Sequence, residues 1–242
     1  MEGVVLTAAE FAVPARGLEA IERFYVERLG LAFRARKRER LQLVAGPATL
    51  GFVEDSDESA QPFHHFALLV PGNRFEAARA WLAEATTLLS RPGEDATTFE
   101  FESWDARACY GHDPSANIVE LIAHRGVEES DCTGPFSARE LRGLSEVGLV
   151  GTGLAEFVHA LRPAGLELWS GEVGDGAGSL GFVGRQAHTL ILCSQGRPWL
   201  PTGRPAESHP VTVTVTSDNG STVVAGVSGG ALVCAGPRIL DR

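Results

Sequence analysis

One arrangement of elements recurs along the chain, and this repetition limits the fold more than any other feature of the sequence. Residues 10–13 read as the end of a strand. A helical pattern of apolar residues follows at 18–29, and Gly30 suits the end of that helix. Strand-like runs come next, at residues 31–34, 41–45 and 49–54. The first quarter of the chain therefore predicts one βαβββ unit.

The same order of elements returns further along the chain. A second copy starts at the strand-like run 65–70, and its helix face is formed by Phe75, Ala78 and Leu82. A third copy starts at Glu146, and its residues 180–183 repeat the sequence of residues 50–53. A fourth starts near His209 but lacks a helix pattern. The sequence thus predicts four units, of which the last is degenerate.

A polar segment rich in Gly and Pro, residues 126–142, separates the second copy from the third. We therefore expect two modules of two units each, at residues 5–125 and 143–242. The predicted fold class is α+β, built from the repeated βαβββ units. The first module is expected to carry any chemistry, and the second to serve as a scaffold or lid.

The charge balance narrows the classes of partner. The formal net charge is −10, from 21 Lys and Arg against 31 Asp and Glu. The basic run at residues 34–40 is interpreted as a solvated strand or loop edge. The acid excess argues against nucleic acid or an anionic membrane as partners. No stretch approaches the ~20 apolar residues of a membrane span, and the four cysteines form no CxxC pair. We expect a cytoplasmic protein.

Three sequence features resemble the vicinal oxygen chelate superfamily, which includes glyoxalase I, fosfomycin-resistance and bleomycin-binding proteins and extradiol dioxygenases. They are Phe24-Tyr25 with Leu29-Gly30, the run 65–68 (HFAL), and the run from Asp113-Pro114 to residues 117–121 (NIVEL). The last is the most specific, since it is similar to the hairpin that carries a metal-binding Glu in that family. The resemblance covers residues 6–124 well and 144–240 more loosely. It implies that the repeated βαβββ units form cupped mixed β-sheets.

The resemblance implies a divalent-metal site in the first module. The matching ligand positions are Glu10, His65 and Glu120, with Glu10 where the family usually has His. One imidazole and two carboxylates favour Fe(II) or Mn(II) over a thiolate-preferring ion. Three protein ligands leave positions open for a substrate with two neighbouring oxygens. The family's fourth position falls at Gly51, which cannot bind a metal.

Each of these residues also has a structural interpretation. Glu10 and Glu146 start two equivalent units, so a Glu at this position can simply bond a neighbouring strand. His65 can be a core histidine with backbone partners. Glu120 lies in an apolar run, where an acid is costly to bury unless it is paired or metal-bound. His112, before the 113–117 turn, is a candidate acid–base group or a solvated loop histidine.

The leading functional hypothesis is a metal-dependent enzyme on a small oxygen-rich substrate, as in an extradiol-type dioxygenase. A metal-free protein that sequesters a small molecule is the first alternative. A glyoxalase-type lyase is the second, and Gly51 counts against it. Besides a small-molecule substrate, a second copy of the chain in a homodimer is the other partner considered.

Overall fold

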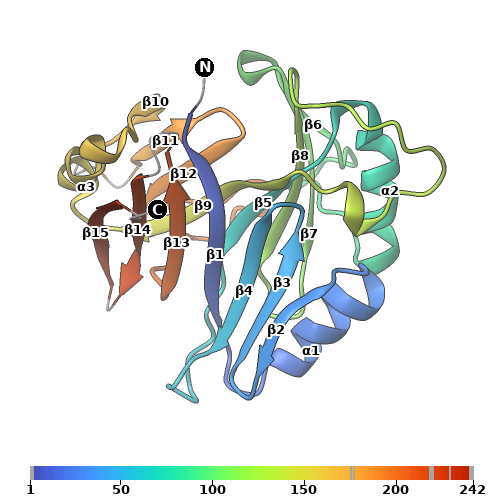
Figure 1. The fold of residues 1–242 in the computed structure, drawn as a ribbon, viewed down its shortest axis with the longest axis horizontal. Coiled ribbons are helices and arrows are strands. Elements are labelled where there is room, and N and C mark those ends of the chain that lie inside the picture. The colour runs from blue at the N-terminus through green and yellow to red at the C-terminus, as the bar shows by residue number, and fades with distance from the viewer. Residues whose placement is uncertain (1–2, 175, 177, 218–220, 229, 240–242) are drawn as a thin grey trace.

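The computed structural model describes residues 3–174, 176, 178–217, 221–228 and 230–239, so the last residues of the expected module 143–242 lie outside the described part. Figure 1 shows strands gathered in the middle of the molecule with helices at its flanks. None of the helices in the described part has the length and apolarity that a membrane crossing requires.

The first two units follow the predicted order of elements. Unit 1 comprises β1 (Val5–Val13), α1 (Leu18–Glu22) continued by the π-helical turn η1 (Arg23–Arg28), β2 (Phe33–Lys37), β3 (Arg40–Ala45) and β4 (Ala48–Glu54). Unit 2 comprises β5 (His65–Leu69), η2 (Gly72–Arg74), α2 (Phe75–Ala85), β6 (Phe99–Phe101), η3 (Glu102–Trp104), β7 (Ala106–His112) and β8 (Ile118–His124). The predicted helix face of Phe75, Ala78 and Leu82 is buried, as expected for an amphipathic helix.

The later units also keep the order, and the last one lacks a helix within its described residues. After η4 (Ala138–Glu140), unit 3 comprises β9 (Gly143–Gly151), α3 (Leu154–Leu161), η5 (Arg162–Ala164), β10 (Leu168–Glu172), β11 (Leu180–Arg185) and β12 (His188–Ser194). Unit 4 comprises β13 (Val211–Thr216), β14 (Ser221–Ser228) and β15 (Ala231–Ile239). The repeated sequence at 50–53 and 180–183 falls in β4 and β11, which are different strands of their units.

The strands form two mixed sheets, and each sheet combines one unit from either side of the linker. Sheet A has the order β15-β14-β13-β1-β4-β3-β2, so it joins unit 4 to unit 1. Sheet B has the order β10-β11-β12-β9-β5-β8-β7-β6, so it joins unit 3 to unit 2. The α+β class with cupped mixed sheets is confirmed. The units, however, do not pair in the sequential order expected for modules 5–125 and 143–242.

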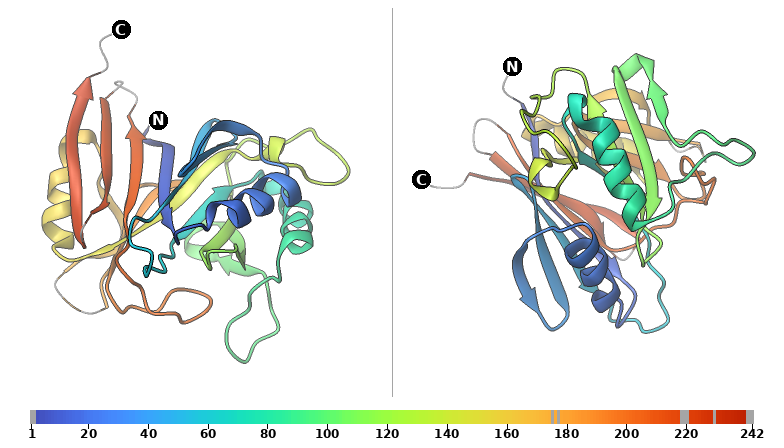
Figure 2. Two further views of the ribbon diagram at one scale, coloured as in Figure 1. Left: turned by 90° about the horizontal axis from the view of Figure 1, so that it is seen from below. Right: turned by 90° about the vertical axis from the view of Figure 1, so that its right-hand side faces the viewer.

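The two sheets pack face to face around one large apolar core. Phe11 of β1 stacks on Phe66 of β5 with ring centroids 4.6 Å apart, and Phe52 of β4 joins them. Helices contribute to the same core, and α3 lies beside the strands of unit 4 (Figure 2). Because side chains alternate along a strand, the residues next to Phe11 and Phe66 point away from this core. Glu10 and His65 therefore lie on outer faces of two different sheets.

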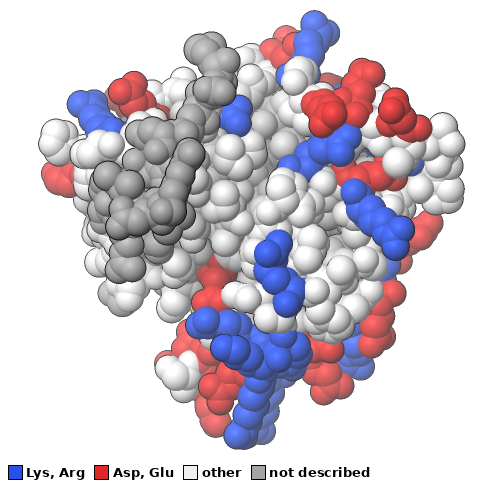
Figure 3. Space-filling model, in the orientation of Figure 1, with Lys and Arg blue, Asp and Glu red and all other residues white. Residues whose placement is uncertain are grey.

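The basic run at residues 34–40 lies on the hairpin of β2 and β3, at one edge of sheet A. Lys and Arg side chains gather at this edge with acidic side chains between them (Figure 3). Arg36 pairs with Glu22 at 2.7 Å. The run is thus an exposed strand edge, as its alternation with acids indicated.

Candidate metal centre

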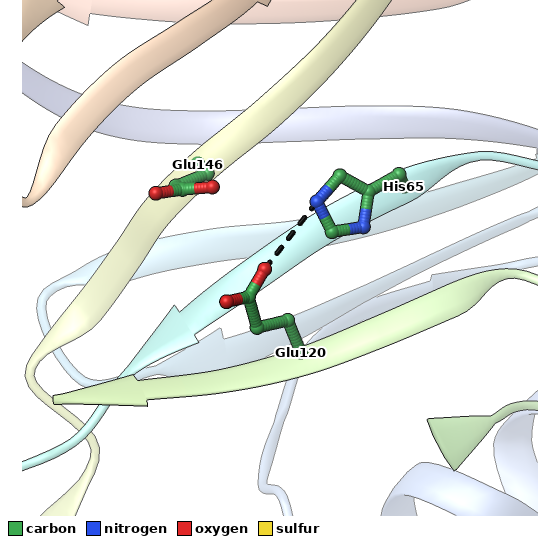
Figure 4. A group of neighbouring side chains, drawn as sticks. All are labelled: His65, Glu120 and Glu146. Atoms are coloured by element: carbon green, nitrogen blue, oxygen red, sulfur yellow. Dashed lines mark ion pairs between the residues drawn. The ribbon is translucent and has the colours of Figure 1, made fainter. Parts of the chain in front are cut away.

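Three ionisable side chains converge on the outer face of sheet B: His65 of β5, Glu120 of β8 and Glu146 of β9. One ligand atom from each lies within 4.8 Å of the others. Figure 4 shows the imidazole and both carboxylates pointing toward one another from three neighbouring strands. The arrangement offers one nitrogen and several oxygens to a single point.

The register of the three strands explains why these side chains meet. Ala67 of β5 stands opposite Glu120 on the parallel strand β8 and opposite Glu146 on the antiparallel strand β9. Paired residues on neighbouring strands share a face, so both carboxylates flank Ala67. His65 is two residues from Ala67 and shares that face. The small methyl group of Ala67 leaves the space between the carboxylates open.

The cluster is buried, which makes its charge balance important. The exposed fractions are 5% for His65, 2% for Glu120 and 4% for Glu146. Burial, and secondarily the nearby Glu120, raises the pKa of Glu146 well above its ordinary value. Two buried carboxylates close together are costly unless a cation or a proton compensates them.

The tautomer of His65 adds a second constraint. Its Nδ1 lies 3.1 Å from the carbonyl oxygen of Ile118, and a carbonyl only accepts, so Nδ1 carries the proton. In a neutral ring, Nε2 then presents a lone pair toward Oε2 of Glu120, 3.4 Å away. Two lone pairs facing each other in a buried site need a cation between them or an added proton. A backbone-bonded Nδ1 with a free Nε2 is also the usual state of a metal-binding histidine.

Tyr110 of β7 supports the cluster from the next strand. It stands opposite Glu120 in the β7–β8 register, and its hydroxyl donates a hydrogen bond to that carboxylate. Burial, with the neighbouring Glu120 and Glu146 charges, raises the pKa of Tyr110 well above its ordinary value. The phenol therefore remains a donor at neutral pH and fixes the orientation of Glu120.

The cluster forms the floor of a cavity of about 370 Å³. Its lining combines the three ionisable residues with mostly aromatic and aliphatic side chains: Phe101, Ser103, Trp104, Tyr110, Leu180, Phe182, Ile191, Arg197, Trp199 and Leu200. This volume lies within the range typical of small-molecule sites.

One wall of the cavity comes from the segment 195–208, between β12 and β13. Backbone hydrogen bonds from Trp199 to Arg204 and from Ala206 to Arg197 close this segment on itself. The Trp199 ring lies 5.0 Å from the His65 ring and packs over Gly148 of β9. A Cβ at Gly148 would lie 3.0 Å from Trp199, so a larger residue there would force the ring or the strand to shift. The segment thus borders the cavity of sheet B.

Of the predicted ligands, the structure brings together His65 and Glu120 but not Glu10. Glu10 lies on the outer face of sheet A, where its Oε2 accepts from Arg40 at 3.1 Å. Its place in the cluster is taken by Glu146, from the half of the chain that was expected to be a scaffold or lid. The cluster thus draws on both halves of the chain, whereas all of the ligands were expected in the first module. Glu10 and Glu146 start equivalent units, and it is Glu146 that lies beside His65 and Glu120.

The other predicted positions lie away from the cluster. Gly51 pairs with Glu10 in sheet A, so it is not the fourth position of this site. In sheet B, strands β9 and β12 pair in the same way as strands β5 and β8. Ile191 of β12 stands opposite Gly148 of β9, just as Glu120 of β8 stands opposite Ala67 of β5. The fourth position is therefore apolar.

Neither His112 nor His209 joins the cluster. Nδ1 of His112 lies 3.2 Å from the carbonyl oxygen of Asn117, and this half-buried side chain does not line the cavity. His209, interpreted from the sequence as structural, pairs with Glu207 at 3.2 Å. The acid–base role considered for His112 has no geometric support here.

Comparison of sequences identifies no relative: no known family profile matches the chain, and no curated protein matches it. Comparison of structures does identify similar folds. A proposed dioxygenase from Bacillus subtilis subsp. subtilis strain 168 aligns with a TM-score of 0.58 at 13% identity, covering 96% of this chain and 84% of that one.

Glyoxalase I from Zea mays aligns with a TM-score of 0.50 at 14% identity, covering 96% of this chain and 92% of that one. Its V278E mutant gives 0.52 at 12% identity, with 95% and 90% covered. Both alignments extend over nearly the whole chain, so the likeness covers all four units. This chain therefore has the fold of the vicinal oxygen chelate superfamily.

Proposed function

We propose that the protein is a metal-dependent enzyme whose divalent ion, Fe(II) or Mn(II), is held by His65, Glu120 and Glu146. The observation that carries the proposal is the geometry of His65, whose Nε2 lone pair faces the Glu120 carboxylate in a buried site. The donor set fits the group, because one imidazole and two carboxylates match the preference of these ions. A divalent charge would also offset the two buried carboxylates.

The substrate class follows from the open side of the site. Three protein ligands leave coordination positions free, and the apolar Ile191 stands where a fourth ligand would come. A bound ion would supply Lewis acidity there and, in the case of iron, a place for dioxygen beside the substrate. The site therefore suits a small molecule with two neighbouring oxygens, and an extradiol-type oxygenation is the reaction we favour.

Metal binding by matched variants tests this proposal. Protein purified without chelator is stripped and titrated with Mn(II), and the free ion is followed by electron paramagnetic resonance. Glu146→Gln and Glu120→Gln keep size and remove charge, so each should weaken binding by about 100-fold. Glu10→Gln, the equivalent change on sheet A, should bind like the unmodified chain. Binding lost in Glu10→Gln and kept in Glu146→Gln would refute the site.

A metal-free binding protein is the second candidate, and the aromatic lining of the cavity favours it. In that case no variant would change metal content, because the unmodified chain would bind none. Oxygen uptake also distinguishes the metal-dependent enzyme from the metal-free binding protein. The Fe(II)-loaded protein should consume dioxygen with a dihydroxybenzene under the proposal, and Glu146→Gln should not.

A further inference from the structure

Several large apolar side chains around the cavity of sheet B are only partly buried. They belong to the residues Phe101, Trp104, Leu180, Phe182 and Leu200. The rings form one continuous wall: Trp104 lies edge to face with Phe182 at 4.4 Å and stacks with Phe101 at 5.9 Å. Apolar surface left open in one concave place indicates a ligand with an apolar, flat body.

One cationic side chain, Arg197, borders the same cavity. It is the single Lys or Arg among the described lining residues. It is half-buried, and its Nη1 donates only a long bond of 3.3 Å to the carbonyl of its neighbour Pro198. No ion pair joins it to a carboxylate within the described residues. In contrast, Arg74 and Arg36 each meet a glutamate at 2.7 Å.

The position of Arg197 separates it from the buried cluster. It is carried by the segment 195–208, two residues before Trp199, whereas His65, Glu120 and Glu146 project from the sheet below. A divalent ion would be balanced by the two glutamates, so the floor of the cavity would carry no net charge. The guanidinium would then be the unbalanced positive group facing the ligand, and guanidinium pairs well with carboxylates.

We propose that the ligand of this cavity is an organic anion with a flat aromatic body, whose ring lies against Trp104 and Phe182 and whose carboxylate pairs with Arg197. The inference rests on the proposed function for the neutral floor of the cavity and for the orientation of the ligand, since the oxygens at the opposite end would face His65, Glu120 and Glu146. Arg197 thereby selects for charge, and the ring wall selects for shape.

The test compares three probes by calorimetric titration: naphthalene-2-carboxylate, its neutral amide, and the saturated decahydronaphthalene-2-carboxylate. Each is titrated into metal-free and Mn(II)-loaded protein. The naphthoate should bind about tenfold more tightly than either of the other probes. Arg197→Ala should remove the preference for the acid over the amide, and Arg197→Lys should restore part of it. Arg34→Ala, an exposed arginine on sheet A, serves as the matched control and should change nothing.

The unmodified chain alone can overturn the inference, so the test does not depend on whether Arg197→Ala folds. Equal binding of acid and amide, no binding of the naphthoate in either form, or an Arg197→Ala variant with its acid preference intact would each refute it. The outcome is independent of the metal experiment. A protein that binds Mn(II) but ignores the charge of the probe keeps the metal site and loses the role of Arg197. A protein that binds no metal but prefers the acid keeps the role of Arg197 and loses the metal site.

Discussion

The hydroxyl of Tyr25 donates a hydrogen bond of 2.9 Å to Oδ2 of Asp113, and so joins the helical segment of unit 1 to the β7–β8 turn of unit 2. Both side chains are buried, and burial raises the pKa of Asp113 above its ordinary value. Tyr25→Phe would remove one donor from a buried carboxyl group, and should lower the free energy of unfolding by about 1–3 kcal/mol. Urea denaturation measures this change, and a loss below about 0.5 kcal/mol would show that Ser115 and Asn117 satisfy the carboxyl group without Tyr25.

The Tyr110 hydroxyl is expected to matter for metal binding more than for folding. Tyr110→Phe keeps the ring in the cavity wall but leaves Glu120 without this donor. We expect Mn(II) affinity to fall by about 10-fold or more. Tyr25→Phe, far from the cluster, is the control and should leave Mn(II) affinity unchanged. Equal affinities for the unmodified chain and Tyr110→Phe would mean that Glu120 is oriented by its strand alone.

Gly148 sets the distance between strand β9 and the Trp199 wall. In Gly148→Ala, the new methyl group would lie 3.0 Å from the Trp199 ring and 3.1 Å from the carbonyl oxygen of His65. The backbone oxygen cannot move aside as a flexible side chain can, so overpacking should cost about 1–3 kcal/mol. Trp199 fluorescence should shift as its ring moves. Gly72→Ala is the control, since nothing lies within 4 Å of a Cβ there.

Acid should destabilise the fold through its buried histidines. Burial lowers the pKa of His64 to about 3, and those of His124 and His188 to about 4. Below the unfolded value of about 6.5, the unfolded chain binds protons that the folded chain does not, so stability falls as the pH falls from about 6.5 toward 4. Each such histidine changes the free energy of unfolding by at most about 1.4 kcal/mol per pH unit.

Replacing one of these histidines should reduce that dependence. His124→Gln removes one of the groups that bind a proton in the unfolded chain. The free energy of unfolding of this variant should therefore change less steeply between pH 6.5 and 4.5 than that of the unmodified chain. His159→Gln, at an exposed position, serves as the matched control. Identical slopes for His124→Gln and the unmodified chain would show that His124 titrates alike in both states.

The local part of this structure could be predicted from the sequence. Periodicity and turn residues identified the four units, the lack of a helix among the described residues of the last unit, and the strands that carry His65 and Glu120. Such signals depend on residues within about one turn or one strand of each other. They also identified Glu10, His65 and Glu146 as the starts of their units.

The choice between Glu10 and Glu146 could not be made in this way. It depends on which first strand lies beside β5, and the answer is β9. Strand β1 pairs with β13 and β4 instead. Long-range pairing of whole strands is decided by the packing of complete sheets, for which neighbouring residues carry little information. The repeated sequence at 50–53 and 180–183 was misleading for a similar reason. It lies in the fourth strand of unit 1 and in the third strand of unit 3, because similar residues occur in strands at different places in a unit.

The pairing of β1 with β13 also has a consequence for how the chain acquires its fold during synthesis. The register joins Val5 to Thr216, so sheet A holds together residues near opposite ends of the chain. Contacts of such sequence separation form slowly, because a long loop must close first. On a ribosome, β1 would emerge long before its partner, whereas sheet B needs nothing beyond β12. We expect the sheet that carries the candidate metal centre to assemble first, and the sheet made from the two ends of the chain to close last.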